Sequence, residues 1–183
     1  MSDQAMNQTA STAGAPAAAA DGGPASAGLN QFISFAIGDE QYGVDIMAVR
    51  EIKGWSQITQ LPRQPDYMRG VLNLRGIMVP IIDLRCRFSQ GMTEATALHI
   101  VIVVQIGSRH VGLLADRVLD IVGINASQVQ PVPRIAQGTR ADFLSGLVTI
   151  ESGMIALIDL SRLLAASAEE GAELAPGEGR LSG

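Results

Sequence analysis

Few residues of this sequence have types and spacings that could act on a substrate. It contains two histidines, His99 and His110, and a single cysteine, Cys86. Arg85 and Arg87 flank the cysteine, and their charges are expected to lower the pKa of its thiol. No histidine is placed in the sequence to activate that thiol as a nucleophile. We interpret His99, which lies in an apolar run, as a structural residue, and we expect His110 to be exposed after a turn.

These residues are also too few for a metal centre, and the familiar cofactor motifs are missing from the sequence. Structural zinc takes four ligands, which two histidines and one cysteine do not supply. The sequence has no glycine-lysine phosphate loop, no dinucleotide-binding glycine pattern and no zinc-protease helix motif. We therefore predict no catalytic residue, no metal and no cofactor, and we expect a protein that is not an enzyme.

Two aspartates, Asp83 and Asp159, each stand in an Ile-Asp-Leu triplet. Paired carboxylates can serve as general acid and base. An aspartate before a helical turn more commonly accepts hydrogen bonds from the free backbone N–H groups at the start of the helix. Because the two triplets match in an internal repeat, described below, we predict that both aspartates cap helices.

Arginine is the informative polar residue of the body of the chain. Residues 31–166 contain 11 arginines and a single lysine, Lys53. A guanidinium group is planar and suits carboxylate pairing at interfaces, and the alternative is a solvated surface charge. Arg75 lies between Leu74 and Gly76, at a tight turn between two apolar segments, which is expected to hold its side chain on the rim of a barrel. Five arginines lie close together in the sequence: Arg63, Arg69, Arg75, Arg85 and Arg87.

The net charge of the chain lies at its two ends. Of the net charge of −5 over 183 residues, residues 1–30 contribute −2 and residues 167–183 contribute −3, because residues 31–166 carry 12 basic and 12 acidic side chains. The ends are low in complexity and lack hydrophobic periodicity. We predict a disordered Ala/Gly-rich arm over residues 1–30 and a disordered acidic tail over residues 167–183.

Composition excludes several classes of protein. A neutral body with few aromatic residues argues against nucleic-acid binding. No run of 18 apolar residues occurs, so no membrane insertion is expected. A single cysteine excludes a disulfide framework and fits a reducing cytosol.

The body has the pattern of many short strands, which favours a small barrel or sandwich. Weak helical signals fall at residues 65–69 and 139–144, and a short helix is expected at residues 160–166. Pro80 interrupts one strand pattern and implies an edge position or a bulge. Strands are expected near residues 32–37, 41–46, 77–82, 99–106, 111–114, 118–122, 146–150 and 154–158.

The two halves of the body resemble each other, which indicates an internal repeat. With a shift of 69 residues, Gly43 matches Gly112 and Val49 matches Val118. The later part matches with a shift of 76, so the second copy has seven extra residues in a proline-containing loop between Ile121 and Gly146. Each copy is about as long as one five-stranded barrel. Two such barrels would be marginal alone and are expected to pack through a third apolar interface.

Residues 70–85, GVLNLRGIMVPIIDLR, resemble the characteristic segment of the CheW-type chemotaxis coupling proteins. Residues 37–46, 49–52 and 61–65 fit the same family, and the similarity covers nearly all of residues 31–166. The arm over residues 1–30 is longer than the family usually carries. The resemblance implies an all-β fold of two SH3-like five-stranded barrels, interleaved along the repeat.

The resemblance also implies a function and partners. It implies a cytoplasmic, non-enzymatic adaptor that bridges the histidine kinase CheA and the cytoplasmic tips of methyl-accepting chemoreceptors, in arrays under the inner membrane. The regulatory domain of the kinase, itself CheW-like, would bind barrel to barrel, and no kinase-binding residue is assigned. Two alternatives stay open: an adaptor of a different motility or second-messenger array, and a small-barrel binder of nucleic acid or a ligand.

The family motifs place a receptor-binding site on named residues of this chain. The Arg of the Asn-Leu-Arg-Gly segment is Arg75, and the Val and Glu of the V-x-E-I segment are Val49 and Glu51. Arg75 would pair with a receptor carboxylate or carbonyl, Val49 would contact apolar helix residues, and Glu51 would set register by charge. By the repeat, Val118 and Ile121 are candidates for the opposite wall of the groove. Gly70 and Gly112 are expected to serve turns or close backbone approach.

Overall fold

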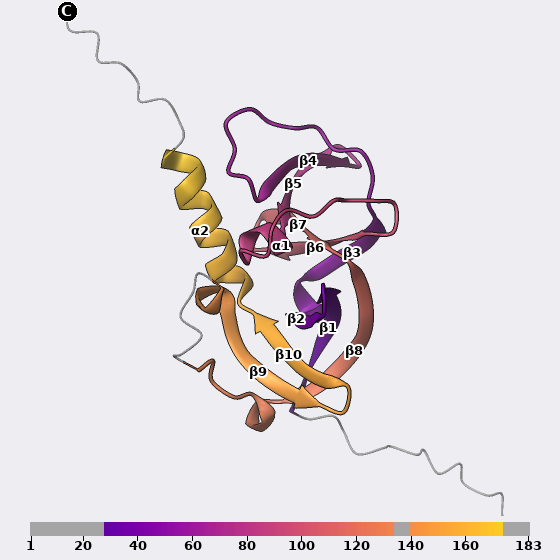
Figure 1. The fold of residues 1–183 in the computed structure, drawn as a ribbon, viewed down its shortest axis with the longest axis vertical. Coiled ribbons are helices and arrows are strands. Elements are labelled where there is room, and N and C mark those ends of the chain that lie inside the picture. The colour runs from indigo at the N-terminus through magenta and orange to yellow at the C-terminus, as the bar shows by residue number, and fades with distance from the viewer. Residues whose placement is uncertain (1–27, 134–139, 174–183) are drawn as a thin grey trace, which may run out of the picture.

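The computed structural model describes residues 28–133 and 140–173, which form two five-stranded sheets. Figure 1 shows one sheet in the lower half of the molecule and the other in the upper half, with a long helix along one side. We call the lower unit barrel A and the upper unit barrel B. In order across the sheet, barrel A contains β8 (Arg117–Asn125), β1 (Leu29–Ile37), β2 (Glu40–Asp45), β10 (Gly153–Ile158) and β9 (Leu144–Ile150). Barrel B contains β3 (Val49–Gly54), β6 (Ile100–Ile106), β7 (Arg109–Ala115), β5 (Ile77–Asp83) and β4 (Met68–Leu74).

Short helical segments connect the strands. The 3-10 helices are η1 (Ile46–Ala48), η2 (Ala126–Gln128) and η4 (Ala141–Phe143), and the α-helices are α1 (Leu84–Arg87) and α2 (Leu160–Glu173). In the part of the chain that the structure describes, no helix has the length and apolar character needed to span a bilayer.

Each sheet curls into a barrel because an isolated bridge connects its two edge strands. In barrel B, the segment after β3 reaches β4, where Thr59 and Val71 exchange two backbone hydrogen bonds of 2.9 and 2.8 Å. In barrel A, the segment after β8 reaches β9, where Gln130 and Leu147 exchange two bonds of 2.8 Å. These closures confirm the prediction of two five-stranded barrels.

The repeat relates the two barrels strand by strand, but neither barrel consists of one copy. The pairs of equivalent strands are β1 with β6, β2 with β7, β8 with β3, β9 with β4 and β10 with β5. Barrel A therefore takes two strands from the first copy and three from the second. All five strands of barrel B lie in residues 49–115, so barrel B is inserted between β2 and β8 of barrel A.

Each barrel contains one parallel strand pair, which the repeat also matches. In barrel B, residues 81–83 of β5 pair with residues 112–114 of β7, and in barrel A, residues 155–157 of β10 pair with residues 41–43 of β2. Pro80 lies just before the paired part of β5, where only β4 is its ladder partner. A proline has no N–H to donate, and although β5 is an inner strand of its sheet, at Pro80 it is paired on one side only, so the predicted edge position holds locally.

Three apolar clusters form the core, one inside each barrel and one between them. Leu72 and Val79 belong to the interior of barrel B, and Val148 and Leu157 belong to the interior of barrel A. The third and largest cluster joins strands of both barrels with α1 and α2. We call it the shared core, and it confirms the predicted third interface. It includes Ile33, Phe35, Ile82, Ile102, Val104, Leu84 and Leu163.

An arginine lies between equivalent aromatic rings of the two copies. The guanidinium carbon of Arg87, in α1, is 4.2 Å from the ring centroid of Tyr67 and 4.5 Å from that of Phe143. Tyr67 and Phe143 match each other in the repeat with the shift of 76. Cation–π contacts of this kind help to fix the two barrels relative to each other.

The helical predictions were partly wrong. Residues 65–69 do not form a helical turn, because the Pro65 carbonyl accepts a single turn bond of 2.8 Å from Met68 N–H and β4 begins at Met68. The expected helical turn in residues 139–144 is present as η4. Helix α2 begins at Leu160 as predicted but ends at Glu173 instead of residue 166, since alanine and glutamate are strong helix formers. Residues 1–27 and 174–183, most of the predicted arm and tail, lie outside the described residues, whereas residues 29–30 of that arm belong to β1 and residues 167–173 of that tail belong to α2.

Candidate functional site

On strand β3, apolar side chains continue from the shared core to the molecular surface. In its antiparallel ladder with β6, Val49 lies opposite Val104 and Ile52 lies opposite Ile102. Residues that lie opposite each other share one face of a sheet, and Val104 and Ile102 are fully buried in the shared core. Val49 is half-buried against that core, whereas Ile52 is 40% exposed.

Strand β8 does the same for barrel A. Val118 lies opposite Phe35 and Ile121 lies opposite Ile33, and both partners belong to the shared core. Val118 packs against that core, and Ile121 is 54% exposed. The predicted residues Val118 and Ile121 therefore occupy the same structural positions on β8 as Val49 and Ile52 do on β3.

Arg75 lies at the tip of the β4–β5 hairpin. Its backbone φ of 52° is in the left-handed region, which costs a residue other than glycine free energy. The Asn73 side chain stabilises the turn, because its Oδ1 accepts a 2.8 Å hydrogen bond from Gly76 N–H. The Arg75 side chain is 85% exposed, as the sequence predicted for a residue on the rim of a barrel.

The structure brings Arg75 and Glu51 together. A guanidinium nitrogen of Arg75 lies 3.6 Å from Oε2 of Glu51, in β3. An exposed ion pair of this kind contributes only about 0–1 kcal/mol, so it orients Arg75 without holding it tightly. Val49, Glu51 and Arg75 thus belong to one region of barrel B, and Val118 and Ile121 belong to the matching region of barrel A.

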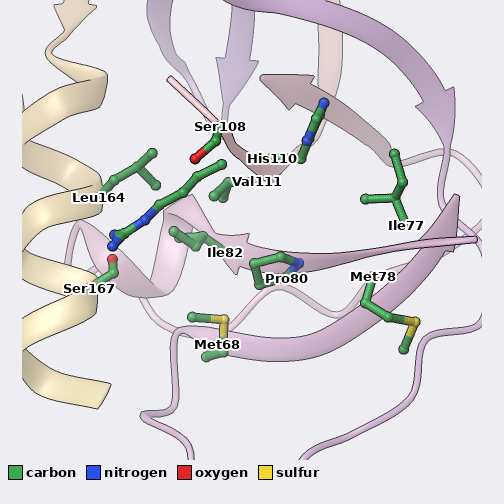
Figure 2. Close-up of a pocket in the computed structure, with 11 residues that line it drawn as sticks. Met68, Ile77, Met78, Pro80, Ile82, Ser108, His110, Val111, Leu164 and Ser167 are labelled. Atoms are coloured by element: carbon green, nitrogen blue, oxygen red, sulfur yellow. The ribbon is translucent and has the colours of Figure 1, made fainter. Parts of the chain in front are cut away.

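Two pockets that the sequence did not predict lie where the parallel strand pairs diverge. The first, of about 400 Å³, lies between the early residues of β5 and β7 beside α2. Figure 2 shows Met68 and Pro80 from the β4–β5 hairpin opposite Ser108 and His110, with Leu164 on the helix. The second pocket, of about 520 Å³, has the repeat-equivalent lining in barrel A, where residues 132–133 and 140–141 take the place of α2. One methionine lines each pocket, Met78 in the first and Met154 in the second, and the repeat matches the two. This match was the feature of the sequence that could have pointed to the pockets.

The prediction for His99 was correct, and the prediction for His110 was not. His99 is a satisfied structural residue as expected, because its Nδ1 accepts a 3.0 Å bond from Thr96 N–H and its Nε2 lies 3.6 Å from Oδ1 of Asp116. His110 is half-buried and lines the first pocket, so the expectation that it is exposed was wrong. His110 lies near the start of β7, and the residues of β4 and β5 that line the same pocket partly cover it.

The expectation of a lowered Cys86 pKa was also wrong, because the lowering by Arg69 and Arg87 is outweighed. Burial raises the pKa of the Cys86 thiol, and the carboxylates of Asp83 and Asp66 raise it further. The side chain of Arg85 pairs instead with Asp116 at 2.7 Å. Among the described residues, no group of three or more His, Cys, Asp and Glu side chains is arranged to hold a metal ion.

Both aspartates cap helices, as predicted. Asp83 Oδ1 accepts a 3.2 Å bond from Cys86 N–H at the start of α1, and Asp159 Oδ1 accepts a 3.0 Å bond from Arg162 N–H at the start of α2. Asp83 is also fully buried and binds the segment that follows α1. Its second oxygen lies 2.9 Å from Thr93 N and 3.2 Å from the Arg69 guanidinium.

The glycines singled out by the repeat are positions of close approach. Gly70 has a φ of 135°, and a Cβ there would collide with the carbonyl oxygen of Thr59 at the closure of barrel B. At Gly112, in the parallel ladder, a Cβ would collide with the side chains of Ile81 and Val101. Their role is structural, as predicted.

Comparison with known proteins places this chain among characterised sequences. A family model described as "CheW-like domain" matches residues 31–168. The chain is 42% identical over 145 residues to the probable chemotaxis protein CheW of Rhizobium etli, covering 79% of this chain and 94% of that protein. It is 41% identical to the chemotaxis protein CheW of Klebsiella aerogenes, covering 76% and 83%. It is 31% identical to protein FrzA of Myxococcus xanthus, covering 73% and 84%.

A solved structure shares the fold. The crystal structure of the scaffolding protein TtCheW from Thermoanaerobacter tengcongensis matches with a TM-score of 0.66 and 31% sequence identity. The match covers 72% of this chain and 85% of that protein.

Proposed function

This chain belongs to the CheW-like family of chemotaxis adaptors, and from that premise we propose that it couples methyl-accepting chemoreceptors to the histidine kinase CheA. In this proposal the protein is a non-enzymatic scaffold at cytoplasmic receptor arrays under the inner membrane. One surface binds the helical tip of a receptor, and another binds the CheW-like regulatory domain of the kinase.

The observation that carries the proposal is the arrangement around Arg75 and Glu51. An exposed guanidinium on a strained turn is oriented by only a weak ion pair and is therefore available to a carboxylate or carbonyl of a partner. The apolar edge of β3 supplies a contact for apolar helix residues at Val49 and Ile52. Val118 and Ile121 supply the matching contact on β8. We assign receptor docking to this surface.

The direct test is Arg75→Ala, measured by calorimetric titration with a soluble hairpin fragment of a chemoreceptor tip from the same organism. We expect the binding free energy to weaken by about 1–3 kcal/mol, which is the usual loss for a truncated interface arginine. Arg109→Ala is the matched control, because Arg109 is an exposed arginine on β7, a strand that pairs with β6 and β5 and not with β3 or β8. Unchanged affinity of the Arg75 variant would remove that residue from the docking surface.

A pull-down from native cytosol tests the function as a whole. We expect it to capture both a CheA-type kinase and a chemoreceptor. Failure of the purified protein to bind either one would contradict the proposal. The similarity to protein FrzA, at 31% identity, favours a second candidate, an adaptor of another signalling array, and the identity of the captured kinase separates the two.

A further inference from the structure

Arg50 is the extra residue of a β-bulge in β3, next to the proposed docking residues. Val49 lies opposite Val104 and Glu51 lies opposite Val103, so Arg50 has no counterpart in β6. A bulge of this kind bends the strand and redirects a side chain. The Arg50 side chain is exposed at the surface of barrel B.

Two neutral acceptors hold the Arg50 guanidinium in place. Its Nε donates a 2.7 Å hydrogen bond to Oε1 of Gln105, and one terminal nitrogen donates a 3.3 Å bond to the carbonyl of Met47. Gln105 is itself fixed, because its amide donates a 2.9 Å bond to the Gly107 carbonyl. The side chain is therefore ordered before any partner arrives, which reduces the conformational entropy lost on binding.

The positive charge of Arg50 is not neutralised within the described part of the chain. Carboxylates pair with Arg69, Arg75, Arg85, Arg140 and Arg162 there, and the recorded ion pairs do not include Arg50. Its two acceptors are an amide and a carbonyl, which carry no net charge. An ordered cation with remaining N–H donors is suited to accept a carboxylate from another molecule.

The surfaces around β3 and β8 are nearly equivalent in the repeat, but the positive charge of Arg50 has no equivalent on β8. Arg50 matches Leu119, which is likewise the extra residue of a bulge in β8, between Val118 and Asp120. Glu51 matches Asp120, and Arg75 matches Glu151. The apolar positions are nearly the same on the two strands, but these three matched positions carry +1 in barrel B and −2 in barrel A; with Lys53 of β3 and Arg117 of β8 the charges become +2 and −1. The three matched pairs are Arg50 with Leu119, Glu51 with Asp120 and Arg75 with Glu151.

We propose that Arg50 is a specificity-determining residue that pairs with a carboxylate of the docked receptor helix and thereby fixes the direction in which the helix lies across the two barrels. The inference rests on the proposed receptor-docking function. Apolar contacts that are alike on both walls would accept a helix in either direction. Opposite charges on the walls favour one direction and penalise the other.

The test combines a change in the protein with a change in the partner. The probe is the receptor-tip hairpin, used in its natural form and in a form whose exposed Asp and Glu residues are replaced by Asn and Gln. We expect Arg50→Gln to weaken binding of the natural hairpin about three- to tenfold at low salt, and to lessen the dependence of the affinity on salt. For the amide hairpin, wild type and variant should bind equally, and Arg109→Gln should bind both hairpins like wild type.

A second variant tests the direction in which the receptor hairpin lies across the two barrels. In the double variant Arg50→Leu with Leu119→Arg, the cation moves from β3 to β8 with no change in overall composition. A nitroxide spin label beside the hairpin carboxylate whose replacement removes the effect of Arg50→Gln should broaden NMR signals of β3 amides in wild type and those of β8 amides in the double variant.

Three outcomes would overturn the inference. If Arg50→Gln binds the natural hairpin like wild type, or weakens both hairpins equally, Arg50 does not pair with a receptor carboxylate. If the label broadens the same strand in wild type and in the double variant, the charges do not set direction. If wild type binds neither hairpin, the receptor-docking function itself fails, and this inference fails with it.

Discussion

In barrel B the carboxylate of Asp83 is fully buried, whereas its equivalent in barrel A, Asp159, keeps about a quarter of its side chain exposed. Both cap the helix that follows them, so the repeat has preserved the capping function. Asp83 also binds Arg69 and Thr93, which lie 14 and 10 residues away, whereas the further partner of Asp159 is Arg162 on the helix that it caps. The two barrels therefore share one backbone plan, including the helix cap, but have specialised in their buried polar groups.

A second difference lies where the barrels meet. Tyr42 in barrel A occupies the position of Val111 in barrel B, and its ring stacks on Phe88 with centroids 5.0 Å apart. Its hydroxyl donates a 2.9 Å hydrogen bond to Glu40, which also pairs with Arg140. Barrel A thus places a polar group in the shared core at a point where barrel B is purely apolar.

The largest predicted effect is on the two capping aspartates. Asp83→Ala should lower the free energy of unfolding by about 3–5 kcal/mol, because it leaves the buried N–H and hydroxyl of Thr93 without their acceptor and removes the ion-pair partner of Arg69, whose side chain is 20% exposed. Asp159→Ala should cost about 1 kcal/mol, which is typical of a lost helix cap. Urea denaturation measures both. Equal losses in the two variants would contradict the claim that the barrels have specialised.

The next effect is a pH dependence of stability that Tyr42 should produce. Burial raises the pKa of Tyr42 to about 12, from an ordinary value of 10 in the unfolded chain, although a hydrogen bond from Gln90 lowers it slightly. Between these values the folded protein retains a proton that the unfolded chain has lost. The contribution of Tyr42 to the free energy of unfolding is therefore constant below pH 10 and should fall by about 2–3 kcal/mol as the pH rises from 10 to 12.

The control for this prediction is Tyr42→Phe, which keeps the aromatic packing. The difference in stability between wild type and this variant should shrink across the same pH range, as measured by urea denaturation at each pH. Parallel pH profiles for the two proteins would show that Tyr42 does not titrate in the shared core.

The smallest predicted effect on stability is at the tip of the β4–β5 hairpin. Arg75→Gly relieves a left-handed backbone but removes the ion pair with Glu51, so the free energy of unfolding should stay within about 1 kcal/mol of wild type. Receptor affinity should nevertheless fall. A large loss of stability would mean that Arg75 serves the fold of barrel B and is not kept for docking. Thermal denaturation followed by circular dichroism measures the change.

Much of the fold could be predicted because the repeat preserves its sterically demanding positions. Gly70 and Gly112 match Gly146 and Gly43, and at each of the four a Cβ would crowd a neighbouring chain segment. The sequence did not reveal which strands share a barrel. Each copy of the repeat could form a barrel alone, or the two copies could exchange strands. Both arrangements have the same alternation of apolar residues, so periodicity does not distinguish them.

The site was predictable only in part. Glu51 and Arg75 are 24 residues apart, and the family resemblance identified both, but nothing in their spacing predicted the ion pair between them. Arg50 was missed because its importance depends on Gln105, which reaches it from the neighbouring strand. Cys86 was misjudged for the same reason. Its neighbours in sequence are arginines, whereas burial and two carboxylates control its pKa.

The insertion of barrel B into barrel A has a consequence for synthesis on the ribosome. When the chain has emerged as far as residue 116, every strand of barrel B is available, but barrel A has only its first hairpin, β1 and β2. The buried face of that hairpin includes Phe35 and Val44 and packs in the shared core against barrel B. We expect barrel B to form first and to shelter the hairpin from aggregation until the last three strands are translated.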